Sequence, residues 1–269
     1  MSLRLAISPC PNDTFVFHAL VHGLVPGAPR MDVTYADVDV TNSRAGEFDL
    51  VKVSVAALPW LLDSHHLLPC GGALGRGCGP LVLTRDGSLT SVAGRSVAVP
   101  GERTTAYLLL RLWSAGAPPA AVTVVPFAEI MPAVASGRFD AGLVIHEARF
   151  TFHRYGLRSL VDLGEWWEAE TGLPIPLGAI VARRDAVDPD AAARWIRESV
   201  RRAWADPTAS EAYVRAHAAE MDPDVAARHI ALYVNAYTED LGDEGRTAID
   251  TLLARAAPHP TAPIMKLTS

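Results

Sequence analysis

The order of secondary structure constrains this chain more than any other feature of its sequence. Short apolar segments alternate with polar turns and helical stretches up to about residue 182. The segments that read as strands are residues 3–7, 31–40, 48–53, 81–83, 96–99, 122–125, 142–145, 160–163 and 177–182. Helices are expected between them, at residues 15–21, 55–62, 105–113, 129–136 and 164–171. This alternation predicts an α/β fold.

The α/β region divides into two halves, and the strands at 81–83 and 177–182 are expected to carry the chain between them. Beyond residue 189 the pattern is helical, in residues 191–204, 210–217, 224–237 and 245–256. We therefore predict a two-lobed α/β protein with a central ligand cleft. Its larger, discontinuous domain would comprise residues 1–85 and 181–269, and its smaller domain residues 95–175. The crossings would lie near residues 81–94 and 176–182.

Composition and charge argue against several classes of protein. The chain has 269 residues and a formal net charge of -6 without a long basic run, so we expect no nucleic-acid partner. No apolar run is long enough to span a bilayer, and no apolar signal segment precedes Pro9. We therefore expect no membrane partner and a cytoplasmic location. Three cysteines without a C-x-x-C pair predict neither a disulfide framework nor a zinc site. Monomer and homodimer both stay open.

His146 follows the apolar segment 142–145, which reads as a buried strand. In open α/β sheets, ligands bind outside the carboxyl ends of the strands, and His146 stands at such an end. Because histidine titrates near neutral pH, His146 is the candidate base. The alternative is a histidine that only hydrogen-bonds a nearby carbonyl group.

Lys52 is unusual because all but two of the 24 basic residues are arginine, and it lies inside an apolar segment. A buried or half-buried lysine needs an anionic partner, which suggests an anionic ligand. Ser54 follows closely as the expected N-cap of helix 55–62. Asn12 or Asp13 would cap helix 15–21 in the same way.

Further polar groups follow the other predicted strands. Asn42 comes after strand 31–40, and Thr104 is the expected N-cap of helix 105–113. The next N–H groups, of Thr105 and Ala106, would point out of the strand ends. Such a helix start binds carboxylate or phosphate groups, although many capped helix starts bind no ligand. Several polar groups at separate strand ends together indicate a site for an anion.

Two other patterns favour structural roles. Residues 71–80 contain G-x-G-x-G, but a strand follows them, whereas a dinucleotide-binding loop requires a helix there. We expect a flexible crossing or a bulge beside the ligand instead. His229, Tyr233 and Tyr237 recur at spacings that put them on one helix face, where we expect packing rather than catalysis.

Four motifs occur in the order found in one enzyme family. They read SPCPNDTF at residues 8–15, GERTTAY at 101–107, IHEARFT at 145–151 and GLPIPLGA at 172–179. Together they resemble the 1,4-dihydroxy-6-naphthoate synthases of the futalosine route to menaquinone, and the similarity runs from Leu3 to about Leu253. The resemblance implies a two-lobed periplasmic-binding-protein-like type II fold. It also implies cyclic de-hypoxanthine futalosine as a small, anionic substrate, and neither a metal nor an organic cofactor.

The resemblance also implies roles for individual residues. His146 would be the proton acceptor, and the substrate-binding residues would be Lys52, Val53, Ser54, Thr105, Ala106, Asn42 and Asp13. A base at His146 would remove a proton next to a carbonyl group, and donors at the Ser54 or Thr105 helix start would stabilise the enolate oxygen. Lobe closure would exclude water.

Three other functions stay open at this point. An anion solute-binding protein uses the same two-lobed architecture. Chorismate dehydratase is a sister enzyme with the same fold and pathway, but the motifs at 8–15 and 145–151 favour the synthase. A ligand-responsive regulator is the third alternative, although no helix-turn-helix segment or basic face is evident.

Overall fold

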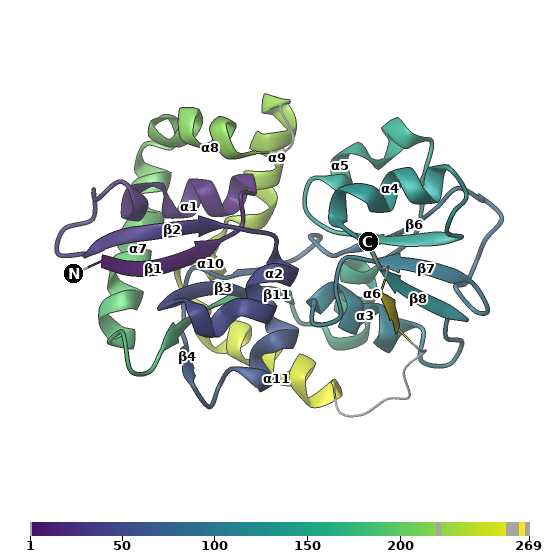
Figure 1. The fold of residues 1–269 in the computed structure, drawn as a ribbon, viewed down its shortest axis with the longest axis horizontal. Coiled ribbons are helices and arrows are strands. Elements are labelled where there is room, and N and C mark those ends of the chain that lie inside the picture. Colours follow the sequence, from purple (N-terminus) through teal and green to yellow (C-terminus); the bar gives the residue numbers. More distant parts are fainter. Residues whose placement is uncertain (1, 219–221, 257–263, 267–269) are drawn as a thin grey trace.

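Two six-stranded sheets form the framework of the protein, for which the computed structural model describes residues 2–218, 222–256 and 264–266. The first sheet contains β1 (Ser2–Ile7), β2 (Arg30–Tyr35), β3 (Leu50–Ser54), β4 (His65–Leu67), β5 (Ala73–Gly75) and β11 (Ile175–Arg183). The second contains β6 (Leu81–Thr84), β7 (Ser96–Val99), β8 (Ala121–Val124), β9 (Ala141–Val144), β10 (Arg158–Asp162) and β12 (Ile264–Lys266). Figure 1 shows the two sheets side by side, each with its own helices. The predicted α/β class is confirmed.

Both sheets mix parallel and antiparallel strands. The first has the order β2-β1-β3-β11-β4, with β5 paired to β11, and the second has the order β10-β6-β9-β7-β8-β12. In the first sheet β1 runs parallel to β2 and β3, and in the second β7 runs parallel to β8 and β9. The chain leaves the first sheet between β5 and β6 and returns to it between β10 and β11. Carboxyl ends of parallel strands are therefore available in both sheets to build a site.

The helices bury the faces of the two sheets. Near the first sheet, α1 (Pro11–Val21) packs against α7 (Pro189–Ala205), α8 (Glu211–His217) and α9 (Pro223–Tyr233), while α11 (Gly242–Arg255) packs against β11. On the second sheet, α3 (Thr105–Trp113) and α4 (Phe127–Ala135) pack against β9, and α6 (Leu163–Thr171) packs against α3. Of the residues that the structure describes, none belongs to a helix long and apolar enough to cross a membrane.

Shorter helices complete the fold. They are α2 (Val38–Arg44), α5 (Ala148–Thr151) and α10 (Ala236–Glu239), with 3-10 helices at Ala45–Glu47, Val55–Trp60, Phe152–Tyr155 and Pro207–Ser210. Helix 105–113 has the predicted bounds. Every residue from Thr105 to Leu110 is buried, so the first half of this helix is surrounded by the core on all its faces. The strands predicted at 81–83 and 96–99 are also confirmed, each within one residue.

The predicted strand 31–40 is wrong in its second half. Strand β2 ends at Tyr35, and α2 begins at Val38. The alternation of apolar residues suggested one long strand, but Val38, Thr41 and Asn42 also share one face at helical spacing, and Thr41 and Asn42 are buried. Asn42 therefore belongs to a helix rather than to a strand end.

Three predicted helix boundaries are also wrong. Helix α1 begins at Pro11 rather than Phe15, because proline suits the first helical position; Asn12 and Asp13 lie inside its first turn and do not cap it. Residues 55–60 form a 3-10 helix that contains Pro59, and the Ser54 side chain makes no capping hydrogen bond. The helix expected over 224–237 ends at Tyr233, and a separate helix α10 carries Tyr237.

Candidate active site

A cavity lies where elements of both sheets meet, and it contains about 690 Å³ of space not filled by atoms, including the part open to solvent. On the side of the first sheet, the first turn of α1 and the end of β3 line the cavity. From the second sheet it is reached by the start of α3 and the residues after β9. The predicted site residues that line it are Asp13, Lys52, Val53, Ser54, Thr105, Ala106 and His146. Residues far apart in the sequence are thus brought together.

Asn42 does not line the cavity but holds Ser54, which does. The Ser54 N–H donates to Asn42 Oδ1 at 2.7 Å, so the Asn42 amide group must turn its NH₂ the other way. That NH₂ donates to Ser54 Oγ at 3.0 Å and to the Arg103 carbonyl oxygen at 3.3 Å. Because Ser54 Oγ accepts from Asn42, the Ser54 O–H is left to donate to another group. Asn42 therefore makes Ser54 a hydrogen-bond donor at the cavity wall.

The start of α3 supplies further donors. The predicted cap is confirmed, because Thr104 Oγ1 accepts a hydrogen bond from the Tyr107 N–H at 3.2 Å. The Thr105 hydroxyl is already engaged, since it donates to Leu177 O at 2.8 Å and accepts from the Ala56 N–H at 3.1 Å. The N–H groups at the first helical positions have no acceptor within a helix. Thr105 is therefore suited to bind a ligand through its backbone rather than through its side chain.

The anionic partner of Lys52 is a residue of the chain itself. Lys52 Nζ lies 2.5 Å from Asp13 Oδ1 and also donates to Gly71 O at 3.2 Å. Both side chains are nearly inaccessible, at 8% and 2% exposed. The other carboxylate oxygen of Asp13 accepts from the N–H and the hydroxyl of Ser8. The sequence argument for an anion beside Lys52 was right, but that anion need not be a ligand.

His146 has a strained backbone. It follows β9 directly and, outside the glycines, is the one described residue with a positive φ, at 54°. A left-handed conformation costs free energy in a residue with a Cβ, and such strain is concentrated at functional sites. The Phe127 and His146 rings lie nearly perpendicular to each other, with their centroids 5.5 Å apart. The turn thereby holds the half-buried ring at the cavity wall.

Other residues that line the cavity were not predicted as site residues from the sequence. His229 and Tyr233 line the cavity from α9, so this buried face borders the cavity as well as the core. Burial lowers the pKa of His229 well below its usual range, with smaller effects from His146 and Lys52. Cys78 also lines the cavity, but burial raises the pKa of its thiol to about 12. It is therefore a poor nucleophile at neutral pH.

The glycine-rich segment approaches the cavity as expected from its composition. Residues Ala73–Gly75 form β5, and the pairing of β5 with β11 is irregular between Pro176 and Gly178. A Cβ atom on Gly72 would lie 2.7 Å from Gly178 O, so only glycine allows the two backbones to approach this closely. Gly178 itself lines the cavity. Among the described residues, no group of three or more histidine, cysteine or acidic side chains is placed to hold a metal ion.

Solved structures with the same architecture fall into two groups. A crystal structure from Archaeoglobus fulgidus matches with a TM-score of 0.88 and 32% identity, over 95% of this chain and 96% of that chain. The alkanesulfonate-binding protein SsuA from Xanthomonas axonopodis pv. citri, bound to MOPS, matches with a TM-score of 0.66 and 16% identity, over 99% and 98% of the two chains. The second likeness establishes the fold alone, and it confirms the expected periplasmic-binding-protein-like architecture.

Comparisons of sequence identify the family. A relative from Streptomyces coelicolor, named 1,4-dihydroxy-6-naphtoate synthase, is 60% identical over 98% of this chain and 96% of its own length. A relative of the same name from Thermus thermophilus is 48% identical over 95% of this chain and 94% of its own length. The family model described as menaquinone biosynthesis matches residues 3–258. The chain thus belongs to the menaquinone biosynthesis family.

Proposed function

We propose that the protein is a 1,4-dihydroxy-6-naphthoate synthase, a cofactor-independent lyase. It converts cyclic de-hypoxanthine futalosine to 1,4-dihydroxy-6-naphthoate and releases the sugar-derived remainder. The observation that carries this proposal is the position of His146. A histidine held by a strained turn borders a cavity that also presents Ser54 and the α3 helix start. A base and preorganised donors in one cavity suit proton removal next to a carbonyl group.

In this proposal His146 takes the proton from the carbon next to the carbonyl group. The electron pair of the broken C–H bond moves onto the carbonyl oxygen, which becomes an enolate. The Ser54 O–H, oriented by Asn42, and the N–H groups of Thr105 and Ala106 are the donors available to this oxygen and to the substrate carboxylate. The ring then opens and the aromatic product forms.

Lys52 and Asp13 have a supporting role in this proposal. Their charges compensate each other, so the pair contributes little net charge to a bound anion. The Lys52 ammonium group has three N–H donors, and Asp13 and Gly71 O account for two of them. Binding of the substrate carboxylate therefore depends chiefly on the helix start and on Ser54.

We further propose two lobes that close over the substrate, one built on each sheet. Their predicted bounds are residues 1–85 plus 181–269 and residues 95–175, but β6 (Leu81–Thr84) and β12 (Ile264–Lys266) pair with the second sheet and so belong to the second lobe. The hydrogen bond from Asn42 to the Arg103 carbonyl oxygen and the one from Ala56 to Thr105 support closure, because each joins the two sides of the cavity. We propose a cytoplasmic location, as expected for a biosynthetic enzyme. The partner is a small anionic molecule rather than nucleic acid, and the protein acts as a monomer or homodimer.

An anion solute-binding protein is the second candidate, because a solved structure with this fold is named an alkanesulfonate-binding protein. A cleft formed between two lobes serves both purposes. Chorismate dehydratase is less favoured, because both named relatives are naphthoate synthases. A base at the cavity wall distinguishes an enzyme from a binding protein, and its removal is the decisive test.

The test incubates the purified protein with cyclic de-hypoxanthine futalosine, without added cofactor, and follows products by mass spectrometry. Wild type and His146→Ala are compared side by side. We expect 1,4-dihydroxy-6-naphthoate from wild type alone. Product from both proteins would contradict the role of His146, and saturable binding without product would favour the solute-binding function.

A further inference from the structure

The mechanism above does not use the imidazole of His229, which is buried at the cavity. Its side chain comes from α9, is 1% exposed, and lines the cavity. A histidine buried to this degree is expected to have hydrogen-bond partners for both ring nitrogens. The structure provides a partner for only one of them.

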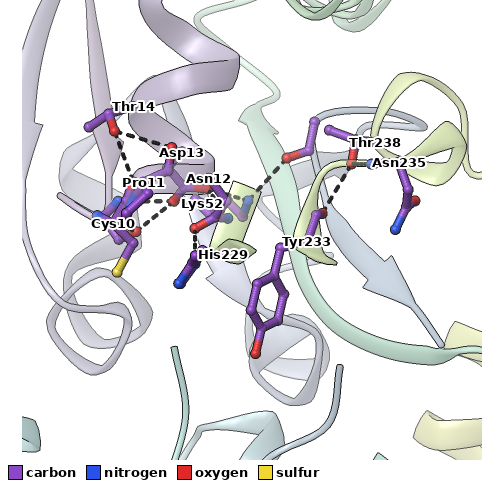
Figure 2. A network of polar contacts seen from close by, with 12 residues as sticks. Cys10, Pro11, Asn12, Asp13, Thr14, Lys52, His229, Tyr233, Asn235 and Thr238 are labelled. Atoms are coloured by element: carbon purple, nitrogen blue, oxygen red, sulfur yellow. Dashed lines mark hydrogen bonds and ion pairs between the residues drawn. The ribbon is translucent and has the colours of Figure 1, made fainter. Parts of the chain in front are cut away.

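Figure 2 shows the chain of contacts that determines which nitrogen carries the hydrogen. The Asp13 carboxylate, paired with Lys52, can only accept, so the Asn12 amide group must turn its NH₂ towards it, and the two lie 2.9 Å apart. The amide oxygen of Asn12 then faces His229 Nε2 at 3.0 Å. Since this oxygen can only accept, Nε2 must carry the hydrogen. The charge on Asp13 thus selects the tautomer of His229 through Asn12.

The other nitrogen of the ring, Nδ1, is therefore a bare acceptor. No described residue donates a hydrogen bond to it, although it is fully buried. Burial also lowers the pKa of His229 well below its usual range, so the ring stays neutral at physiological pH and Nδ1 keeps its lone pair. An unsatisfied buried acceptor costs about 1–3 kcal/mol, which a ligand that supplies an O–H or N–H group recovers.

The neighbouring rings restrict where that ligand group can lie. The His229 ring is nearly parallel to the His146 ring, at 11° and a centroid distance of 6.3 Å. Tyr233 packs on His229 at 4.6 Å. A substrate carbon positioned for proton removal by His146 therefore has its substituents within the volume that His229 borders. The substrate's aromatic part carries the carboxylate, whereas its sugar-derived part carries the hydroxyl groups.

We propose that His229 Nδ1 accepts a hydrogen bond from a hydroxyl group in the sugar-derived part of the substrate. This inference rests on the proposed function and adds to it a residue that binds and selects the substrate. His146 and His229 then have different roles: one accepts a proton from carbon, and the other orients the bound molecule. Asn12, Asp13 and Lys52 are positioning residues that keep Nδ1 free of hydrogen.

Two variants separate the two ring nitrogens. His229→Gln places an amide where Nε2 stands, so it can still donate to Asn12, but it has no acceptor at the Nδ1 position. His229→Asn places an amide oxygen near the Nδ1 position and loses the bond to Asn12. If Nδ1 binds substrate, we expect His229→Gln to lower kcat/KM by about 10-fold to 100-fold, and His229→Asn to recover part of that loss.

The product provides the matched control for these variants. 1,4-Dihydroxy-6-naphthoate lacks the sugar-derived part, so its Kd, measured by calorimetry, is expected to change less than threefold in His229→Gln. Urea denaturation of both variants checks that they are folded. An equal loss of affinity for product would overturn the assignment to the sugar-derived part, and unchanged kcat/KM in His229→Gln would overturn the role of Nδ1 altogether while leaving the enzyme assignment intact.

A spectroscopic measurement tests the tautomer without any turnover. In ligand-free protein with ¹⁵N-labelled histidine, we expect His229 to give the signals of a neutral ring with hydrogen on Nε2, identified by their loss in His229→Gln. In Asp13→Asn the constraint on the Asn12 amide group is removed, and a second tautomer is expected to appear. A ring protonated at Nδ1 in the wild type would refute the inference even if the protein proved not to be the proposed enzyme.

Discussion

The buried pair of Lys52 and Asp13 allows a quantitative prediction for stability. The single variants Asp13→Asn and Lys52→Met each leave one charge without its counterpart in a site where the side chains are 8% and 2% exposed. Removal of one partner from a buried ion pair typically costs about 3–5 kcal/mol, because the remaining charge stays out of water. We expect each single variant to lose free energy of unfolding in this range.

The double variant Asp13→Asn/Lys52→Met should lose less free energy of unfolding than the sum of the losses in the two single variants. It contains no buried charge at this site, and the introduced amide oxygen can still accept from the Ser8 hydroxyl, as the Asp13 carboxylate does at 2.8 Å. Replacement of both partners of a buried pair by neutral groups is often nearly neutral. The expected coupling energy is therefore at least about 2 kcal/mol.

Urea denaturation followed by tryptophan fluorescence measures all four proteins, with circular dichroism as a second probe of a single transition. An Arg44→Ala variant serves as a control, because its ion pair with Glu47 is more than half exposed on both sides and should contribute little. Additive losses in the double variant would refute the reasoning, since they would mean that the two charges do not compensate each other. Losses below about 1 kcal/mol in both single variants would equally contradict it.

Three further predictions concern backbone strain, pH and lobe contact. Because His146 has a φ of 54°, the free energy of unfolding of His146→Gly should be about 1 kcal/mol higher than that of His146→Ala, so the glycine variant is the more stable. Both variants should be inactive in the product assay. For Asp49, burial alone would raise the pKa, but hydrogen bonds and charge from Arg4 outweigh it and the pKa is lowered. Its stabilising effect is therefore present above about pH 4 and lost as the pH falls through the lowered value. Asp49→Asn should be less stable at pH 7, and its free energy of unfolding, measured by urea denaturation, should change less between about pH 5 and pH 3 than that of the wild type. A Cβ atom on Gly101 would lie 1.9 Å from Asp39 Oδ1. Gly101→Ala should therefore raise KM by hindering the approach of the two lobes, while far-UV circular dichroism stays unchanged.

Where local chemistry determined the structure, the sequence was a good guide to the fold. Helix α3 was predicted to the residue because Thr104 is a strong cap and an uninterrupted apolar run follows it. The alternation of strands and helices along the chain was equally clear, and the α/β class followed from that order. By contrast, the segment from Val38 to Asn42 satisfied both a strand pattern and a helix pattern, and only tertiary packing decided between them.

Most residues of the candidate site could be predicted from the sequence, but the contacts between them could not. The sequence indicated that Lys52 required an anion, yet nothing local could identify Asp13, 39 residues earlier, as that anion. His229 was assigned to packing because the buried face of α9 serves the core and the cavity at once. The strained turn at His146 had only a weak sequence signal, since histidine adopts a positive φ more often than most residues but far less readily than glycine.

The two bonds between Asn42 and Ser54 have a consequence for the order in which a ligand is captured. Asn42 lies in α2 and Ser54 ends β3, against which α2 packs, so the Ser54 hydroxyl is oriented without any contribution from the second sheet. The donor at Ser54 is thus preformed before an anion binds, and binding does not have to remove the rotational freedom of the hydroxyl. The remaining N–H of the same amide donates to Arg103 O. The Asn42 side chain therefore orients the Ser54 hydroxyl and also contacts the segment that leads into α3 on the other side of the cavity.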